Sequence, residues 1–122
     1  KDLKQSINLV KKHKIKTLVS ISRIKSQHPR FTYKFLPSLR IKPFLKKYKN
    51  LSPRRQDIED LYFLDGTVYL SEVKTFSKKK SFYHKNTHAF LVDDWKSLEI
   101  DNLSDFKLAE LIMKNKKNFT QL

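Results

Sequence analysis

Two acidic side chains separated by one residue, Glu99 and Asp101, stand directly before a segment with helical periodicity. Alternate residues of an extended segment point to the same side, so the two carboxylates are expected to converge. Mg²⁺ is commonly held by one or two carboxylates together with water and substrate phosphates. The pair is therefore a candidate magnesium site. The alternative is that both acids only complement the positive N-terminal end of the following helix.

A second polar cluster is formed by Arg54, Arg55, Gln56 and Asp57. The planar guanidinium group matches a carboxylate or phosphate with two parallel hydrogen bonds, and the Gln56 amide offers both a donor and an acceptor. The cluster is a candidate site for an anionic substrate. A solvated surface is the alternative.

Three aromatic residues form the third candidate group: Tyr69, Phe82 and Tyr83. Aromatic residues in such patterns belong to a core more often than to a binding site. Phe82 and Tyr83 lie in a polar stretch, however, where burial would need an explanation. Both interpretations stay open at this point.

Helices and strands alternate around these candidates. Apolar spacing predicts a helix over 2–13, and a β-branched run predicts a strand over 17–22. A short helix over 73–76, a strand over 87–92 and a final helix after Asn102 follow, the last with a capping box completed by Asp105. This alternation predicts an α/β layer.

Asp65 and Gly66 stand between two apolar runs, and Gly66 is the only glycine of the chain. An Asp-Gly pair in this setting is typical of a β-hairpin, so a tight turn is expected here.

Residues 30–53 differ from the rest of the chain in composition, with Pro37, Pro43, many cations and short aromatic clusters. Proline confines strands to edges or strand starts. An extended arm with exposed Phe, Tyr and Leu would be a liability in a monomer. We expect residues 30–53 to be a dimerisation arm within one domain, 1–122.

The net charge of +15 in 122 residues is unevenly distributed. Residues 1–55 carry 17 Lys and Arg against one acid, whereas residues 56–122 carry 10 Lys and 11 acids. Such asymmetry favours an anionic partner, and lysine-rich solvated faces are the alternative.

The absence of cysteine fits a reducing compartment, so a cytoplasmic protein is expected. No apolar run approaches the length that spans a bilayer.

The candidate motifs together resemble an ordered series in acylneuraminate cytidylyltransferases, also known as CMP-sialic acid synthetases. The family forms are RRQD, NGAIY, an aromatic pair, and S-(I/V)-D-I-D-x-x-x-D-F-x-x-A-E. Their counterparts are Arg54-Arg-Gln-Asp57, Asp65-Gly-Thr-Val-Tyr69, Phe82-Tyr83 and Ser97-Leu-Glu-Ile-Asp-Asn-Leu-Ser-Asp-Phe-Lys-Leu-Ala-Glu110. A helix, a Leu-Val-Ser-Ile-Ser strand and His28-Pro29 resemble the segment before the family's dimerisation arm.

The resemblance implies the C-terminal part of a Rossmann-like nucleotidyltransferase fold with an inserted dimerisation arm. It also implies a homodimer that transfers CMP from CTP to a sialic-acid-type sugar with Mg²⁺ as cofactor. Glu99 and Asp101 match the metal-binding and catalytic D-x-D positions. The matches for the sugar site are Arg55, Gln56, Tyr69, Phe82 and Tyr83, with Arg55 reaching toward the partner subunit.

Four departures qualify this resemblance. Glu99 replaces the usual Asp, and Asp65 replaces the usual Asn. The family lysine after His-Pro has no clear counterpart, which leaves Arg30 and Lys34 as candidates. The Gly-rich loop that cradles CTP is missing, so the chain is expected to be a fragment that is inactive alone.

The rival hypotheses are a small basic nucleic-acid-binding module and a non-catalytic remnant that only dimerises. Steep salt dependence of binding would mark the first. The motif series makes nucleic acid the weaker expectation, and it leaves open which nonulosonic acid would be the substrate.

Overall fold

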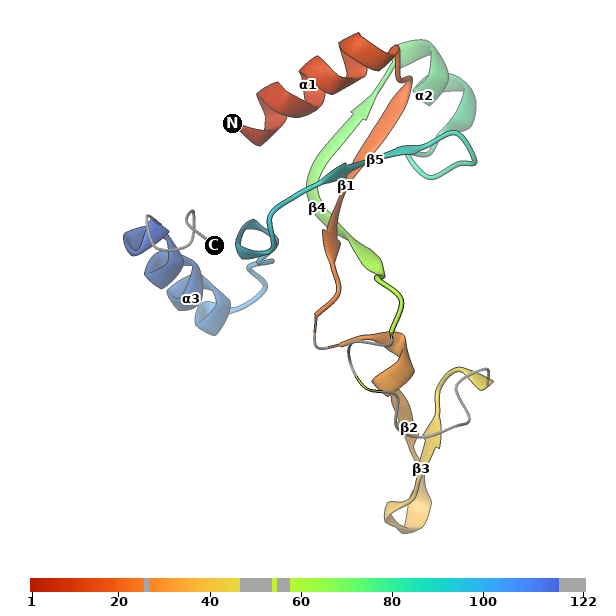
Figure 1. Cartoon of the computed structure of the whole chain (residues 1–122), viewed down its shortest axis with the longest axis vertical. Coiled ribbons are helices and arrows are strands. Elements are labelled where there is room, and N and C mark those ends of the chain that lie inside the picture. Colours follow the sequence, from red (N-terminus) through yellow and green to blue (C-terminus); the bar gives the residue numbers. More distant parts are fainter. Residues whose placement is uncertain (26, 47–53, 55–57, 117–122) are drawn as a thin grey trace. The chain divides into compact units, whose positions relative to one another are not determined.

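The computed structural model describes residues 1–25, 27–46, 54 and 58–116 of the chain (Figure 1). The chain divides into two compact units. We call Lys1–Ser22 with Leu64–Leu122 the sheet unit, and Arg23–Phe63 the arm unit. The arm unit contains the predicted arm, residues 30–53.

The sheet unit is built on three strands in the order β4-β1-β5. The central strand is β1 (Thr17–Arg23), and its parallel neighbour is β5 (His88–Leu91), with Leu18 opposite His88. The other neighbour, β4 (Tyr62–Ser71), is antiparallel because contacts join Lys16 to Glu72, Thr17 to Ser71 and Ser20 to Val68. The sheet is therefore mixed, which agrees with the predicted α/β class.

Strand β1 is buried along almost its whole length, including Thr17, Leu18, Val19 and Ser20. A central strand covered on both faces has no solvent side, and the β-branched run predicted at 17–22 suits that environment. The prediction of a strand there is confirmed. Its serine and threonine hydroxyls are buried as well, so they need hydrogen-bond partners inside the sheet.

The predicted helices are also confirmed. Helix α1 (Asp2–His13) ends at Lys14, whose left-handed backbone lets its N–H bond to the Val10 carbonyl. The short helix α2 (Val73–Lys79) follows β4. Helix α3 (Leu103–Lys114) begins at Asn102, where the capping box with Asp105 is present in full.

The hairpin expected at Asp65-Gly66 is wrong, because both residues lie inside the single strand β4. Asp65 and Val68 are both buried, although a regular strand points residues three apart to opposite faces. Gly66 has a φ of 72°, which is the left-handed geometry of a bulge residue. The Asp-Gly pair thus shifts the register of a continuing strand and does not reverse the chain.

The described part of the arm unit contains two short antiparallel strands, β2 (Tyr33–Phe35) and β3 (Ile41–Pro43). The 3₁₀ helix η1 (Pro29–Phe31) precedes them, and η2 (Pro37–Leu39) makes the turn between them. Short strands with proline at the edge agree with the sequence pattern. A Rossmann-like whole and a dimerisation role for this arm remain predictions.

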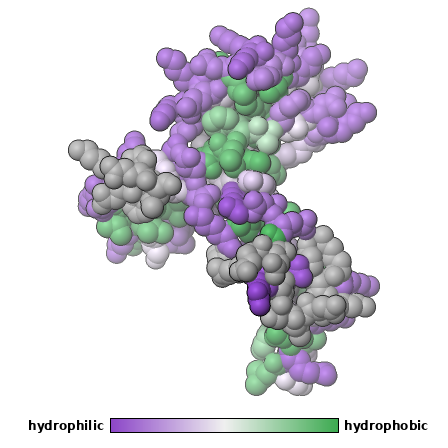
Figure 2. Space-filling model, in the orientation of Figure 1, coloured by the Kyte–Doolittle hydropathy of each residue, from purple (hydrophilic) through white to green (hydrophobic). Residues whose placement is uncertain are grey.

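Large apolar side chains are exposed in both units, and Figure 2 shows them in green on α3 and at the β2–β3 turn. On α3 they include Leu103, Phe106 and Leu111. The apolar residues that are fully buried in the described chain are few: Leu18, Val19, Val68 and Val92. The core therefore sits around β1.

Candidate functional site

The structure gathers the three predicted aromatic residues into one cluster in the sheet unit. Tyr69 lies near the end of β4, and Phe82 and Tyr83 lie in the loop between α2 and β5. The Tyr69 ring is 5.3 Å from that of Phe82 and 6.2 Å from that of Tyr83, the second pair edge to face. The Tyr83 hydroxyl donates to the Tyr69 hydroxyl over 3.0 Å.

The loop that carries Phe82 and Tyr83 is fixed by short-range hydrogen bonds. The Tyr83 N–H donates to the Ser81 hydroxyl over 2.9 Å, and the Thr87 hydroxyl donates to the Phe82 carbonyl over 2.7 Å. Tyr69 and Tyr83 nevertheless remain exposed. The cluster is thus an ordered, accessible surface, which is the property that a binding site needs and a core lacks.

A fourth aromatic residue, Phe76 on α2, joins this cluster although the sequence analysis did not single it out. Its ring lies 4.8 Å from that of Phe82. The sequence pattern of a short amphipathic helix does not distinguish a phenylalanine at a binding surface from one in the core. Only the placement of α2 directly after β4 brings it beside the loop.

Tyr69 carries the polar end of the cluster. The hydrogen bond shared with Tyr83, burial and the negative charges of Asp65 and Glu99 raise the pKa of the Tyr69 phenol. The phenol is therefore neutral at physiological pH. It can present a hydroxyl hydrogen to an acceptor on a ligand.

Glu99 and Asp101 lie in the extended segment before α3, and both are exposed. The N-terminal cap of α3 is made by Asn102 and Asp105, with the Asp101 backbone N–H donating to the Asp105 carboxylate over 3.1 Å. Neither predicted carboxylate makes a hydrogen bond or ion pair with the described residues. The capping function thus falls to other side chains.

The Glu99 carboxylate also lies near the bulge of β4, because a Cβ atom at Gly66 would lie 3.9 Å from Glu99 Oε1. Carboxylate oxygens suit a hard cation such as Mg²⁺. Among residues 1–25, 27–46, 54 and 58–116, no three acidic or histidine side chains gather into a metal-binding group. The described chain offers two exposed carboxylates here, and a magnesium site remains a prediction.

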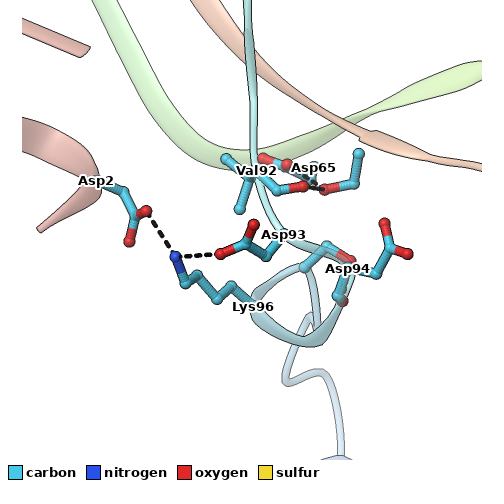
Figure 3. Close-up of polar contacts among 8 residues, drawn as sticks. Asp2, Asp65, Val92, Asp93, Asp94 and Lys96 are labelled. Carbon is cyan, nitrogen blue, oxygen red and sulfur yellow. Dashed lines mark hydrogen bonds and ion pairs between the residues drawn. The ribbon is translucent and has the colours of Figure 1, made fainter. Parts of the chain in front are cut away.

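Lys96 anchors the segment that leads to Glu99 (Figure 3). Its ammonium group lies 2.7 Å from the carboxylates of both Asp2, at the start of α1, and Asp93, before the 3₁₀ helix η5 (Asp94–Lys96). The Lys96 side chain is only 19% exposed. Burial alone would lower the pKa of Lys96, but the bonds to Asp2 and Asp93 outweigh it and raise the pKa.

The other predicted substrate-binding residues belong to the arm unit. Arg55 and Gln56 lie outside the described residues. Arg30 lies in η1 and is half-buried, and Lys34 lies in β2 with its ammonium group 5.7 Å from the Phe44 ring centroid. The structure therefore describes the aromatic and acidic candidates together in one unit and leaves the Arg55–Gln56 pair as a prediction.

The arm unit also has a pocket of about 310 Å³ lined by residues that include Arg23, His28, Phe31 and Asp60. Arg23 and Asp60 are paired as an ion pair. His28 is buried, and its Nδ1 accepts a hydrogen bond from the Arg30 N–H over 3.1 Å. That contact caps η1, so this histidine has a local structural role.

Comparisons with known proteins find similarity to N-acylneuraminate cytidylyltransferases and to a flagellin modification protein. The chain is 36% identical over 53 residues, 43% of its length, to the N-acylneuraminate cytidylyltransferase of Streptococcus agalactiae serotype III. The same figures apply to the enzyme of serotype Ia. The present chain is 27% identical over 62 residues, 51% of its own length, to "Post-translational flagellin modification protein B" of Campylobacter coli.

The matched stretch covers 13% of the length of the streptococcal relatives and 26% of the Campylobacter protein. No family model matches the sequence. The resemblance to acylneuraminate cytidylyltransferases is confirmed by these named relatives. In the described part of the chain, no helix is both long and apolar enough to cross a membrane.

Proposed function

We propose that this chain supplies the sugar-binding and metal-binding residues of a cytidylyltransferase that transfers CMP from CTP to a sialic-acid-type sugar. The observation that carries the proposal is the cluster of the exposed Tyr69 and Tyr83 with the half-buried Phe82, in the unit that also holds Glu99. Similarity to the streptococcal N-acylneuraminate cytidylyltransferases supports it.

The chemistry of the substrates fits these residues. In the reaction the anomeric hydroxyl oxygen of the sugar forms a bond to the α-phosphorus of CTP. The bond from that phosphorus to the bridging oxygen breaks, pyrophosphate leaves, and the hydroxyl proton is released. The protein contributes positioning and electrostatic stabilisation in phosphoryl chemistry of this kind. Phe82 and Tyr83 provide an apolar face for the acyl substituent, and Tyr69 provides a hydroxyl donor.

Glu99 and Asp101 would hold Mg²⁺, because both carboxylates are exposed and the helix cap already has its own side chains. When bound, the ion neutralises negative charge that develops on the phosphate oxygens. Glu99 is one methylene longer than the Asp of the family pattern. Its carboxylate lies near Gly66 in the bulge of β4.

Arg55 is proposed to bind the carboxylate of the sugar across a homodimer interface, with Gln56 beside it. The guanidinium fork provides two hydrogen bonds to one carboxylate, which a lysine cannot reproduce. Arg55→Lys should therefore raise the apparent KM for the sugar and leave that for CTP almost unchanged. Equal losses for both substrates would instead assign Arg55 to the fold or to the triphosphate.

Asp101→Asn tests the core of the proposal, because it keeps the side-chain shape and removes the charge. In an enzyme assembled with a CTP-binding part, we expect turnover of CTP and N-acetylneuraminate to fall by about 100-fold or more, partly recovered at high Mg²⁺ or Mn²⁺. Glu110→Gln, which removes an exposed charge elsewhere on α3, is the matched control and should retain turnover.

A second readout does not depend on turnover. Mn²⁺ added to the full chain should broaden the amide resonances of Glu99 and Asp101, and Asp101→Asn should abolish this broadening. Normal turnover of both Asp101→Asn and Glu99→Gln at limiting Mg²⁺ would contradict the metal assignment.

A further inference from the structure

The bulge of β4 is held by a buried acidic side chain that the proposed reaction does not use. Asp65 is 4% exposed, and it lies directly before Gly66. A carboxylate is rarely buried this deeply unless its oxygens have partners. Its partners therefore indicate what holds the bulge together.

Every described contact of the Asp65 carboxylate comes from a hydrogen-bond donor of the sheet. The Ser20 hydroxyl donates to Oδ1, the Ser22 hydroxyl donates to Oδ2 over 2.6 Å, and the Thr67 N–H donates to Oδ1 over 2.9 Å. Both serines are themselves buried in β1. The carboxylate thus ties the bulge in β4 to the central strand.

The same network extends to the residue before Tyr69. The Val68 N–H donates to the Ser20 hydroxyl oxygen over 2.8 Å, and the Ser20 hydroxyl hydrogen is directed to Asp65. A backbone donor of β4 is therefore satisfied by a side chain of β1. The Ser20 hydroxyl thus accepts from the Val68 N–H while it donates its own hydrogen to Asp65.

The charge of Asp65 is stabilised by these donors. Burial alone would raise its pKa, but the hydrogen bonds from Ser20, Ser22 and Thr67 outweigh burial and lower the pKa below the ordinary value. Within the described residues no cation forms an ion pair with it. The carboxylate is therefore held by hydrogen bonds from the sheet and not by a cation of the described chain.

The bulge determines which face of the sheet Tyr69 occupies. After the bulge Val68 is buried and Tyr69 is exposed, so that its ring meets Phe82 and its hydroxyl meets Tyr83. A shift of one residue in a strand moves every side chain to the opposite face. In a regular strand residues four apart share a face, so without the bulge Asp65 and Tyr69 would both be buried.

We propose that Asp65 is a positioning residue that fixes the β4 bulge and thereby orients Tyr69 toward the sugar. This inference rests on the proposed function for its ligand. Its structural part, the orientation of Tyr69 relative to Phe82, does not depend on any ligand. Asp65 acts through Tyr69 and makes no contact with substrate.

Two substitutions at this position separate geometry from charge. Asp65→Leu is similar in size but accepts no hydrogen bond, so Ser20, Ser22 and Thr67 lose their acceptor. Asp65→Asn keeps one acceptor oxygen for Ser20 and Thr67, and its amide can donate to the Ser22 hydroxyl. That hydroxyl can then donate to the Val92 carbonyl, which lies 3.4 Å away. Asn should therefore rescue what Leu removes.

The experiment combines two NMR measurements on the full chain. The first is the nuclear Overhauser contact between the Tyr69 and Phe82 rings in the absence of ligand. The second is the affinity for N-acetylneuraminate, from shifts of the Tyr69 and Tyr83 ring resonances. We expect Asp65→Leu to remove the ring contact and weaken the affinity by about tenfold or more, and Asp65→Asn to preserve both.

Ser20→Ala is a milder variant that tests the inference if Asp65→Leu fails to fold. It should speed hydrogen exchange at the Val68 amide and weaken the Tyr69–Phe82 contact. An unchanged ring contact in Asp65→Leu, or in Ser20→Ala where the Leu variant is unfolded, would overturn the inference. Failure of the wild-type chain to bind the sugar, with the ring contact still dependent on Asp65, would overturn the proposed function and leave the structural part intact.

Discussion

The sheet unit and the arm unit differ in how far they bury their apolar side chains. In the sheet unit a small apolar core surrounds β1, and the buried hydroxyls and the Asp65 carboxylate pair with one another. In the described part of the arm unit no apolar side chain is fully buried, and Leu39 and Phe35 are 85% and 73% exposed. Both units expose large apolar side chains, but only the sheet unit has buried apolar residues among the described ones.

This difference bears on the predicted dimerisation arm. Exposed apolar surface of this kind is typical of interaction sites. The contrast supports the prediction that the arm pairs with another copy. It also predicts that similar substitutions should have different consequences in the two units, and three experiments test this.

The largest difference is expected for truncating a leucine in each unit. Leu18→Ala removes a fully buried side chain of β1 and should lower the free energy of unfolding by about 2–5 kcal/mol. Leu39→Ala removes an exposed side chain and should change the stability of the monomer by less than about 0.5 kcal/mol. Chemical denaturation of both variants at low protein concentration measures this. Equal losses would contradict the contrast between the units.

An intermediate effect is expected from placing charge on the arm. Phe35→Asp should weaken self-association by about tenfold or more, because a carboxylate in an apolar interface must be desolvated without a partner. Val73→Asp, at an equally exposed apolar position of the sheet unit, is the matched control. Sedimentation velocity over a range of micromolar concentrations distinguishes them. A wild-type chain that stays monomeric throughout this range would show that the arm does not pair.

The smallest effect is expected at the ion pairs of Lys96. Lys96→Met leaves the Asp2 and Asp93 carboxylates without their shared cation and should cost about 1 kcal/mol of stability. Lys107→Met, which removes a surface cation of α3, should cost less than about 0.3 kcal/mol. Thermal unfolding at low and high salt provides the comparison, and a Lys96 variant as stable as the Lys107 variant would remove this anchor from the account of the site.

Local patterns were sufficient to predict the elements themselves. The lysine-flanked apolar spacing of α1, the β-branched run of β1 and the Asn102–Asp105 capping box all act over a few residues. Sequence alone therefore predicted α1, β1 and α3. The error at Asp65-Gly66 has the same origin, because a glycine with positive φ serves a turn and a bulge equally well.

The polar network was invisible to such patterns. Asp65 is 43 residues from Ser22, and Lys96 is 94 residues from Asp2. The candidate site could be predicted in part from the sequence, because motifs identified Tyr69, Phe82 and Tyr83. Phe76 joins them only through tertiary packing. Contacts between distant residues depend on the register of β4 against β1, and that register depends on the bulge.

The sheet unit is interrupted in the sequence, because the arm unit is inserted between β1 and most of β4. Strand β1 therefore leaves the ribosome long before either of its partners, and the sheet forms only after the arm has been synthesised. Contacts of such long sequence separation slow folding. Loop-closure entropy rises only slowly with length, so doubling the inserted segment would cost about 0.6 kcal/mol. The arm can consequently change in length without destroying the sheet that carries Tyr69.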